Sequence, residues 1–133
     1  LGAPDMRHAI GYALNWPERA ELPVARLDLA QIGALSFHAP DSGRYPALRL
    51  AREVMAMGGT AGAAFNAAKE AALDGFISGR IGFLDMARLV EAVLAEMSSR
   101  QGLGNAALSL DNVMHTDAEA RRLGRAMIET GRI

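Results

Sequence analysis

Residues 85–97 read DMARLVEAVLAEM, and this stretch decides the fold class. Asp85 stands where a helix of about four turns would begin. The apolar side chains that follow recur at the spacing of one helix face: Met86, Leu89, Val90, Val93, Leu94 and Met97. An amphipathic helix of this kind is stable when other elements cover its apolar face. The stretch therefore predicts partner helices elsewhere in the chain.

The sequence before residue 85 predicts two of these partners. Pro46 suits the first turn of a helix, and apolar residues continue from it until Gly58–Gly59. Thr60 is then expected to cap an alanine-rich helix that ends at Gly79 and can pack closely against its neighbours. The predicted apolar face of this second helix consists of Phe65, Ala68, Ala72, Leu73, Phe76 and Ile77.

The sequence after residue 97 predicts the last partner. Gly102, Gly104 and Asn105 mark a loop, and residues 116–119, TDAE, have the form of a capping box before a final helix. Four amphipathic helices joined by short loops bury their apolar faces most simply as an antiparallel bundle. We therefore expect a mainly α fold with a four-helix bundle, in which the loop from residue 100 to 111 leaves room for one longer crossing.

The first 43 residues have a different character. Asp5 can cap a short helix that reaches about Asn15, because apolar residues recur at helical spacing and Pro17 forbids continuation. The proline-containing sequence that follows predicts an extended connector, with a half-turn at residues 28–31 and one strand at residues 34–38.

Charge and composition argue against several classes of function. Lys and Arg number 14 and Asp and Glu 15, a formal net charge of -1, so no strong field attracts nucleic acid or a membrane surface. The chain has 13 arginines, but the acidic residues balance them, which makes a DNA-binding helical domain a poor alternative. The absence of cysteine excludes disulfides and thiolate zinc sites, and it favours a cytoplasmic location. No apolar stretch approaches the roughly 20 residues of a membrane span.

The histidines do not assemble a recognisable metal motif. His8, His38 and His115 fall on different segments, so no helix face presents two of them. Asp5 and His8 are close enough in sequence to face the same way, but two ligands do not make a site. The preferred interpretation is a capping Asp and a surface or subunit-facing His.

Other patterns also favour an ordinary structural interpretation. Residues 58–62, GGTAG, follow a predicted helix and lack a Walker lysine, so they indicate a helix stop and not a nucleotide loop. Glu70 and Asp74 are interpreted as a solvated helix face and not as an acid–base pair. The serines show no Gly-x-Ser-x-Gly elbow. Core filling is preferred over an adaptable partner groove for four methionines: Met55, Met86, Met97 and Met127.

Several stretches form a series that resembles one enzyme family. Residues 2–7, GAPDMR, and 13–19, ALNWPER, are similar to its Gly-x-Pro-Asp-Met-Arg and Ala-Leu-x-Trp-Pro-x-Arg patterns. The series continues in the family's order and spacing through residues 27–29, 35–41, 45–51, 66–72, 76 and 81–85. This family is 1-deoxy-D-xylulose 5-phosphate reductoisomerase, and the resemblance is to its C-terminal part. Lys69, where the family usually has Asn, and His8–Ala9, where it has Thr-Pro, depart from the pattern and leave local packing open.

The resemblance implies an NADPH-dependent oxidoreductase of the non-mevalonate isoprenoid pathway. Such an enzyme converts 1-deoxy-D-xylulose 5-phosphate to 2-C-methyl-D-erythritol 4-phosphate with NADP as cofactor and a divalent metal, Mg, Mn or Co. Its subunit has a Rossmann domain, an α/β catalytic domain and a helical C-terminal domain, and the family is homodimeric. Residues 1–20 would be the end of the catalytic domain, 21–43 the connector and 44–133 the helical bundle.

The same resemblance places the chemistry outside this chain. The family's metal ligands, cofactor site and phosphate-gripping side chains precede the position of Leu1, so this chain alone is expected to be inactive and to hold no catalytic, cofactor or metal residue. Pro4 and Met6 match positions that flank the substrate pocket on its apolar side, where they would give shape and exclude water. The alternative is a free-standing helical protein-interaction module. The start of the chain, which lacks an initiator Met, favours the interior of a longer enzyme.

Overall fold

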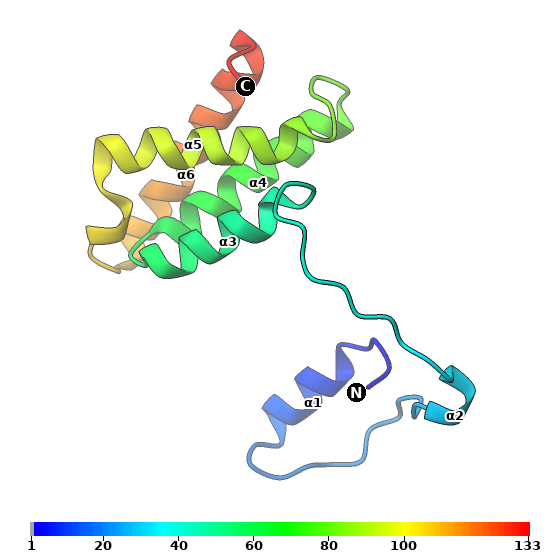
Figure 1. The fold of residues 1–133 in the computed structure, drawn as a ribbon. Helices are drawn as coiled ribbons and strands as arrows, with labels where there is room; N and C mark the ends of the chain where they lie inside the picture. The colour runs from blue at the N-terminus through cyan, green and yellow to red at the C-terminus, as the bar shows by residue number, and fades with distance from the viewer. Residues whose placement is uncertain (1) are drawn as a thin grey trace. The chain divides into compact units, whose positions relative to one another are not determined.

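The computed structural model describes residues 2–133, with the side chain of Gln101 excepted. Leu1, the first residue of the predicted 1–20 segment, lies outside the described residues. The chain forms two compact units, Leu1–Ala39 and Pro40–Ile133 (Figure 1). All regular structure in residues 2–133 is helical, which confirms the mainly α fold class.

The first unit contains two short helices. Helix α1 spans Arg7–Leu14, which confirms the predicted helix to within two residues at its start, but Met6 and not Asp5 occupies the N-cap position. Helix α2 spans Leu29–Ile32, where the half-turn was expected, and the Asp28 carboxylate caps it by accepting the backbone N–H groups of Ala30 and Gln31. Neither helix contains a buried residue.

The predicted strand at residues 34–38 is wrong for this chain. No strand occurs among residues 2–133, and residues 34–38 have no assigned regular structure. A strand needs a neighbour that pairs with its N–H and C=O groups. The described residues supply no such neighbour, so the extended sequence pattern has nothing to pair with.

The second unit is the predicted antiparallel four-helix bundle. Consecutive helices run in opposite directions, and α4 packs against each of the other three (Figure 1). A short 3-10 helix, η1, precedes the last helix. The bounds are α3 Pro46–Met57, α4 Ala61–Ile77, α5 Asp85–Gln101, η1 Leu103–Asn105 and α6 Leu110–Thr130.

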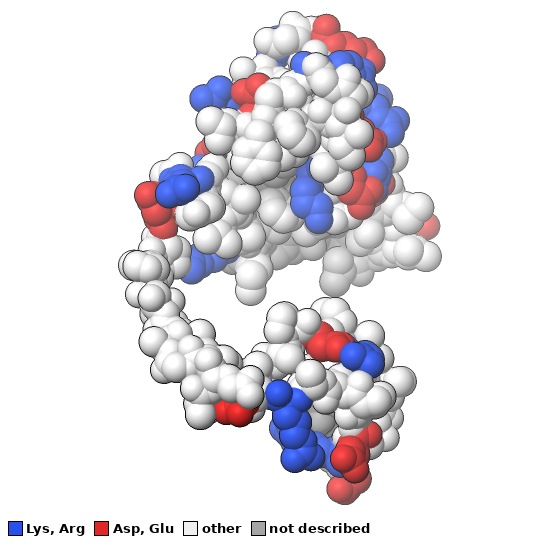
Figure 2. Space-filling view, turned by 90° about the vertical axis from the view of Figure 1, so that its right-hand side faces the viewer, with Lys and Arg blue, Asp and Glu red and all other residues white. Residues whose placement is uncertain are grey.

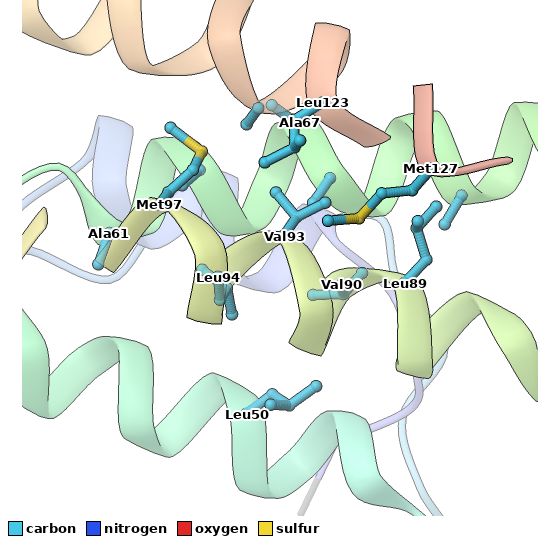
Figure 3. Packing of buried hydrophobic residues seen from close by; sticks show 14 of the residues in the cluster. Leu50, Ala61, Ala67, Leu89, Val90, Val93, Leu94, Met97, Leu123 and Met127 are labelled. Atoms are coloured by element: carbon cyan, nitrogen blue, oxygen red, sulfur yellow. The ribbon is translucent and has the colours of Figure 1, made fainter. Parts of the chain in front are cut away.

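The predicted apolar face of α5 is confirmed. Leu89 and Val93 are 0% exposed, and Met97 is 1% exposed. Figure 3 shows this face in the middle of the core, with Leu50 of α3 on one side and Met127 of α6 on the other. The helix that identified the fold class in the sequence is thus covered by other helices of the bundle.

The predicted apolar face of α4 is partly wrong. Leu73 and Ile77 are 46% and 74% exposed. The buried face consists of small residues instead: Ala61, Ala64, Ala67, Ala68, Ala71, Ala72 and Gly75. A central helix with three neighbours needs small side chains where they approach closely, and this requirement outweighs the pattern of larger apolar residues.

Two glycines show how close α4 and α6 come. A Cβ added at Gly75 would lie 2.8 Å from the Ile128 side chain, and one added at Gly124 would lie 3.2 Å from the Cβ of Ala71. Contacts this short leave no room for a larger residue. The prediction that the alanine-rich helix packs closely against its neighbours is confirmed.

The predicted start of the last helix is wrong. Helix α6 begins at Leu110, and the hydroxyl of Ser109 caps it by accepting the backbone N–H of Asn112 at 3.2 Å. Thr116 lies inside the helix and is 4% exposed. Its capping-box partner Glu119 binds Arg122 instead. Ser109 is also a good cap, and by starting there the helix gains about two further turns of backbone hydrogen bonds.

The turn between α3 and α4 confirms the helix stop at residues 58–62. Gly58 and Gly59 have φ angles of 71° and 52°, which favour glycine. Thr60 occupies the N-cap position as predicted, but its hydroxyl makes no capping hydrogen bond. Instead its backbone N–H donates to the Leu103 carbonyl at 3.1 Å. The connection to η1 therefore holds this end of α4.

The methionines divide between core and surface. Met97 and Met127 are buried, and Met86 packs against the core, which confirms core filling for these three. Met55 is 82% exposed, so the prediction was wrong for this residue. Met55 lies on the side of α3 that faces away from the other bundle helices.

Candidate functional site at the start of the first helix

Pro4 and Met6 lie in the segment that leads into α1. Met6 occupies the N-cap position of the helix, and its side chain is 71% exposed. Pro4 is also exposed, two residues earlier. Asp5 lies between them and is more buried than either. The two expected substrate-flanking residues thus present their side chains at the surface of the first unit, on either side of a charged residue.

The Asp5 carboxylate binds Arg7, the residue that follows Met6. One carboxylate oxygen accepts the backbone N–H of Arg7 at 2.9 Å, and both oxygens accept the Arg7 Nε–H at 3.0 Å. The Arg7 Nη2 group makes a further contact to the same carboxylate. The Asp5 carbonyl also accepts the backbone N–H of His8 at 3.2 Å. These bonds fix the chain on both sides of Met6.

The pairing shifts the ionisation of both groups. Hydrogen bonds from the Arg7 side chain, and then from its backbone N–H, lower the pKa of Asp5 to about 2. The same carboxylate raises the pKa of the Arg7 guanidinium. Asp5 is therefore a carboxylate at neutral pH whose lone pairs are engaged, which makes it a poor proton acceptor.

The Asp5–His8 pair does not form a metal site in this arrangement. The Asp5 carboxylate binds Arg7, and His8 Nε2 is buried without a hydrogen-bond partner in the described part of the chain. Residues 2–133 contain no group of three or more His, Cys, Asp or Glu side chains that could hold a metal ion. The residues present therefore do not fit a divalent metal.

A cavity of about 660 Å³ lies beside α1 in the first unit, but it does not include Pro4 or Met6. His8, Tyr12, Arg19 and Arg26 are among its lining residues. The guanidinium of Arg19 already lies 4.9 Å from the centre of the Tyr12 ring. The cavity is open, and Nη2 of Arg26 lies 4.0 Å from the carboxylate of Glu21, so both cationic side chains have neighbours of their own.

Glu70 and Asp74, which the sequence predicted to be a solvated helix face and not an acid–base pair, have different surroundings. Glu70 binds Arg121 of α6 at 2.7 Å and the amide of Asn66 at 3.0 Å, and Asp74 is exposed. The Arg121 side chain is the main cause of a lowered pKa for Glu70, and Asn66 adds to it. Arg121 also binds Asp117 at 2.7 Å. Glu70 therefore joins two helices and does not act with Asp74.

The role of Arg7 was not predicted from the sequence. The spacing Asp-x-Arg at a helix start was a usable signal, because a carboxylate there can accept both a backbone N–H and the arginine. By contrast, the contact between Glu70 and Arg121 joins residues far apart in sequence, and no local spacing indicates it.

On the face shown in Figure 2, Lys and Arg side chains lie among Asp and Glu side chains.

Comparison with known proteins gives the family. Residues 1–123 match the DXP reductoisomerase C-terminal domain. The chain belongs to this family. Two curated 1-deoxy-D-xylulose 5-phosphate reductoisomerases illustrate the relationship. The protein of Ruegeria pomeroyi is 70% identical over 92% of this chain and 31% of the relative. The protein of Jannaschia sp. is 60% identical over 96% of this chain and 33% of the relative.

Solved structures of DXP reductoisomerases have the same fold in the matching part. The enzyme from Zymomonas mobilis in complex with NADPH matches with a TM-score of 0.83 and 41% identity, over 97% of this chain and 33% of the other. A DXP reductoisomerase in complex with NADPH, fosmidomycin and magnesium matches with a TM-score of 0.81 and 35% identity, over 99% of this chain and 33% of the other. The chain thus spans about a third of the length of the relatives it matches. No helix in its described part has the length and apolar character needed to cross a membrane.

Proposed function

We propose that this chain is the C-terminal part of an NADPH-dependent reductoisomerase that converts 1-deoxy-D-xylulose 5-phosphate to 2-C-methyl-D-erythritol 4-phosphate. The observation that carries the proposal is the 70% identity to the Ruegeria pomeroyi enzyme over 92% of this chain. Identity at this level across nearly the whole chain supports a shared role in the same kind of subunit. The reaction itself belongs to the full-length protein.

The bundle supports the catalytic part of that subunit. In this proposal residues 1–20 are the end of the catalytic domain, residues 21–43 are the connector, and residues 44–133 form the supporting helical domain. The second unit has a core of its own, built from Leu50, Leu89, Val93 and Met127 among others. A rigid module of this kind can fix neighbouring elements, and catalytic geometry depends on such support.

Pro4 and Met6 flank the substrate pocket on its apolar side in the proposed enzyme. An exposed proline and an exposed methionine two residues apart can shape a pocket wall and exclude water. When bound, the divalent metal would act as a Lewis acid and NADPH would supply the hydride. Residues 2–133 contain no group that fits the metal, so we assign its ligands and the cofactor site to the preceding part of the enzyme.

The proposed enzyme is a cytoplasmic homodimer that binds neither nucleic acid nor membrane. The balanced charge supports the absence of nucleic-acid and membrane binding, and the absence of cysteine supports the cytoplasmic location. The homodimer is inferred from the family that the chain resembles. The large exposed apolar residues of the first unit, including Trp16 at 69% and Phe37 at 83%, support a surface that other parts of the same enzyme cover.

Steady-state kinetics on the full-length protein tests the proposal. NADPH oxidation should require 1-deoxy-D-xylulose 5-phosphate and a divalent metal, and the 133-residue chain alone should give no turnover. Replacing Leu89 and Val93 by Ala should lower stability and activity together, because both side chains are 0% exposed in the bundle core. Turnover by the isolated chain would contradict the assignment of the chemistry, and lost turnover with unchanged melting would contradict the supporting role.

A further inference from the structure

We propose that Asp5 is a positioning residue that holds Met6 in place for the substrate. The inference rests on the proposed function, in which Met6 lines the pocket. Asp5 precedes Met6 and Arg7 follows it, and the two charged residues are joined to each other by several hydrogen bonds. The carboxylate thus closes a small ring of chain that contains Met6.

The ring fixes the backbone of Met6 on both sides. The Asp5 side chain accepts the Arg7 backbone N–H at 2.9 Å, and the Asp5 carbonyl accepts the His8 backbone N–H at 3.2 Å. The Met6 carbonyl accepts the backbone N–H of Ile10 at 3.0 Å, which begins the hydrogen bonding of α1. The peptide groups next to Met6 therefore have fixed directions, although its side chain makes few contacts within the chain.

A methionine in this setting needs its backbone to be fixed. Its side chain has three rotatable bonds and is 71% exposed, so packing within this chain does not select one direction for it. Fixing the Cα–Cβ direction is then the main way to limit where the side chain can reach. Preorganisation of this kind is what binding surfaces use to reduce the entropy lost when a ligand binds.

Asp28 shows that capping alone does not require the arginine. Its carboxylate caps α2 by accepting the N–H groups of Ala30 at 2.9 Å and Gln31 at 3.3 Å, with no hydrogen bond from a cationic side chain in the described residues. Asp5 makes the same kind of backbone contact and adds the guanidinium of Arg7. The additional charged contact restrains the chain at Met6 beyond what capping supplies.

Pro4 adds a restraint on the same segment, because its ring fixes its own φ angle directly before Asp5. Gly2 lies near the imidazole of His8, since a Cβ added at Gly2 would lie 3.6 Å from its Nε2.

Kinetics of the full-length enzyme tests the positioning role. The variants are Asp5→Ala, Asp5→Asn, Met6→Ala and the double variant Asp5→Ala/Met6→Ala. Asp28→Ala is the matched control, because it removes another carboxylate that accepts backbone N–H groups. Asp5→Ala should lower kcat/KM for 1-deoxy-D-xylulose 5-phosphate by roughly tenfold, mostly through KM, with the KM for NADPH unchanged. Asp5→Asn keeps an acceptor for the Arg7 backbone N–H, so its kcat/KM should fall less than that of Asp5→Ala. Asp28→Ala should leave the KM for the phosphosugar unchanged.

The double variant separates positioning from general support. If Asp5 acts through Met6, Asp5→Ala should add little to the effect of Met6→Ala. Additive effects, or a fall in kcat with an unchanged KM, would overturn the inference, and Asp5→Asn decides the matter if Asp5→Ala does not fold. An inactive wild-type enzyme would instead refute the proposed function. Normal kinetics of Met6→Ala in an active enzyme would refute the placement of Met6, and the inference with it.

Discussion

The two units of the chain differ in where their apolar side chains lie. In the unit Pro40–Ile133, α3, α4, α5 and α6 all bury residues in one cluster. In the unit Leu1–Ala39, neither α1 nor α2 buries any residue. The first unit nevertheless has local order, because Asp5, Asn15 and Asp28 hydrogen-bond to backbone groups close by.

This difference separates two sources of order. Capping and turn hydrogen bonds can set the local path of a chain, but each contributes only about 1 kcal/mol. Burial of apolar surface contributes more to the stability of a fold, and in the described residues it is concentrated in the bundle. The second unit should therefore fold by itself, whereas the first should not.

Separating the two units should produce the largest effect. Residues 40–133 should unfold cooperatively and with nearly the helix content of the bundle, because the core cluster lies entirely within them. Residues 1–39 should show no cooperative transition. Circular dichroism during thermal unfolding of the two peptides measures this. A cooperative transition of residues 1–39, or its absence in residues 40–133, would remove the distinction between the units.

The same substitution in each unit should sharpen the comparison. Leu89→Ala in α5 should lower the free energy of unfolding by about 3 kcal/mol, because a side chain with 0% exposure leaves a cavity. Leu14→Ala in α1 should change it by less than about 0.5 kcal/mol, because that side chain is 81% exposed. Urea unfolding of the 133-residue chain measures both. Similar losses from the two substitutions would show that α1 contributes to the cooperative core.

Acid should produce the smallest effect, and only through the second unit. Arg121 lowers the pKa of Glu70 in the folded state. The ion pair therefore stabilises the folded bundle fully above pH 4.5, the ordinary pKa of Glu70, and loses this effect as the pH falls through the folded-state pKa. Glu70→Gln should therefore flatten the decline of the bundle's melting temperature below about pH 4.5. Asp5→Asn removes a carboxylate with a pKa of about 2 but lies in the first unit, so it should leave that melting curve unchanged. Melting curves between pH 2 and pH 7 compare the two variants. A larger change from Asp5→Asn than from Glu70→Gln would contradict the assignment of stability to the bundle.

Much of the fold was predictable because its signals are local. The apolar face of α5, the helix stop at Gly58–Gly59 and the half-turn at residues 28–31 each depend on spacing within a few residues. The sequence also contained the series of motifs that indicated the family, which the match over residues 1–123 confirms. Pro4 and Met6 remain a prediction, since their role depends on a part of the enzyme beyond this chain.

The errors occurred where a local preference competed with packing. Thr116 and Glu119 form a good capping pattern, but α6 starts at Leu110 and buries Thr116 in the bundle. Leu73 and Ile77 fit an apolar face of α4, but neighbouring helices approach α4 along its alanines instead. In both cases the decision depended on which residues of other helices came close, and no window of the sequence contains that information.

The sequence by itself determined which segments form helices, where α3 stops and which family the chain belongs to, because these depend on short-range spacing and on residue identity. Only the tertiary structure decided which of several apolar residues were buried and which charged residues met. Gly124 against Ala71 and Glu70 against Arg121 are contacts between separate helices. Packing distance between helices is a property of the whole bundle, since it depends on the side chains of both partners together.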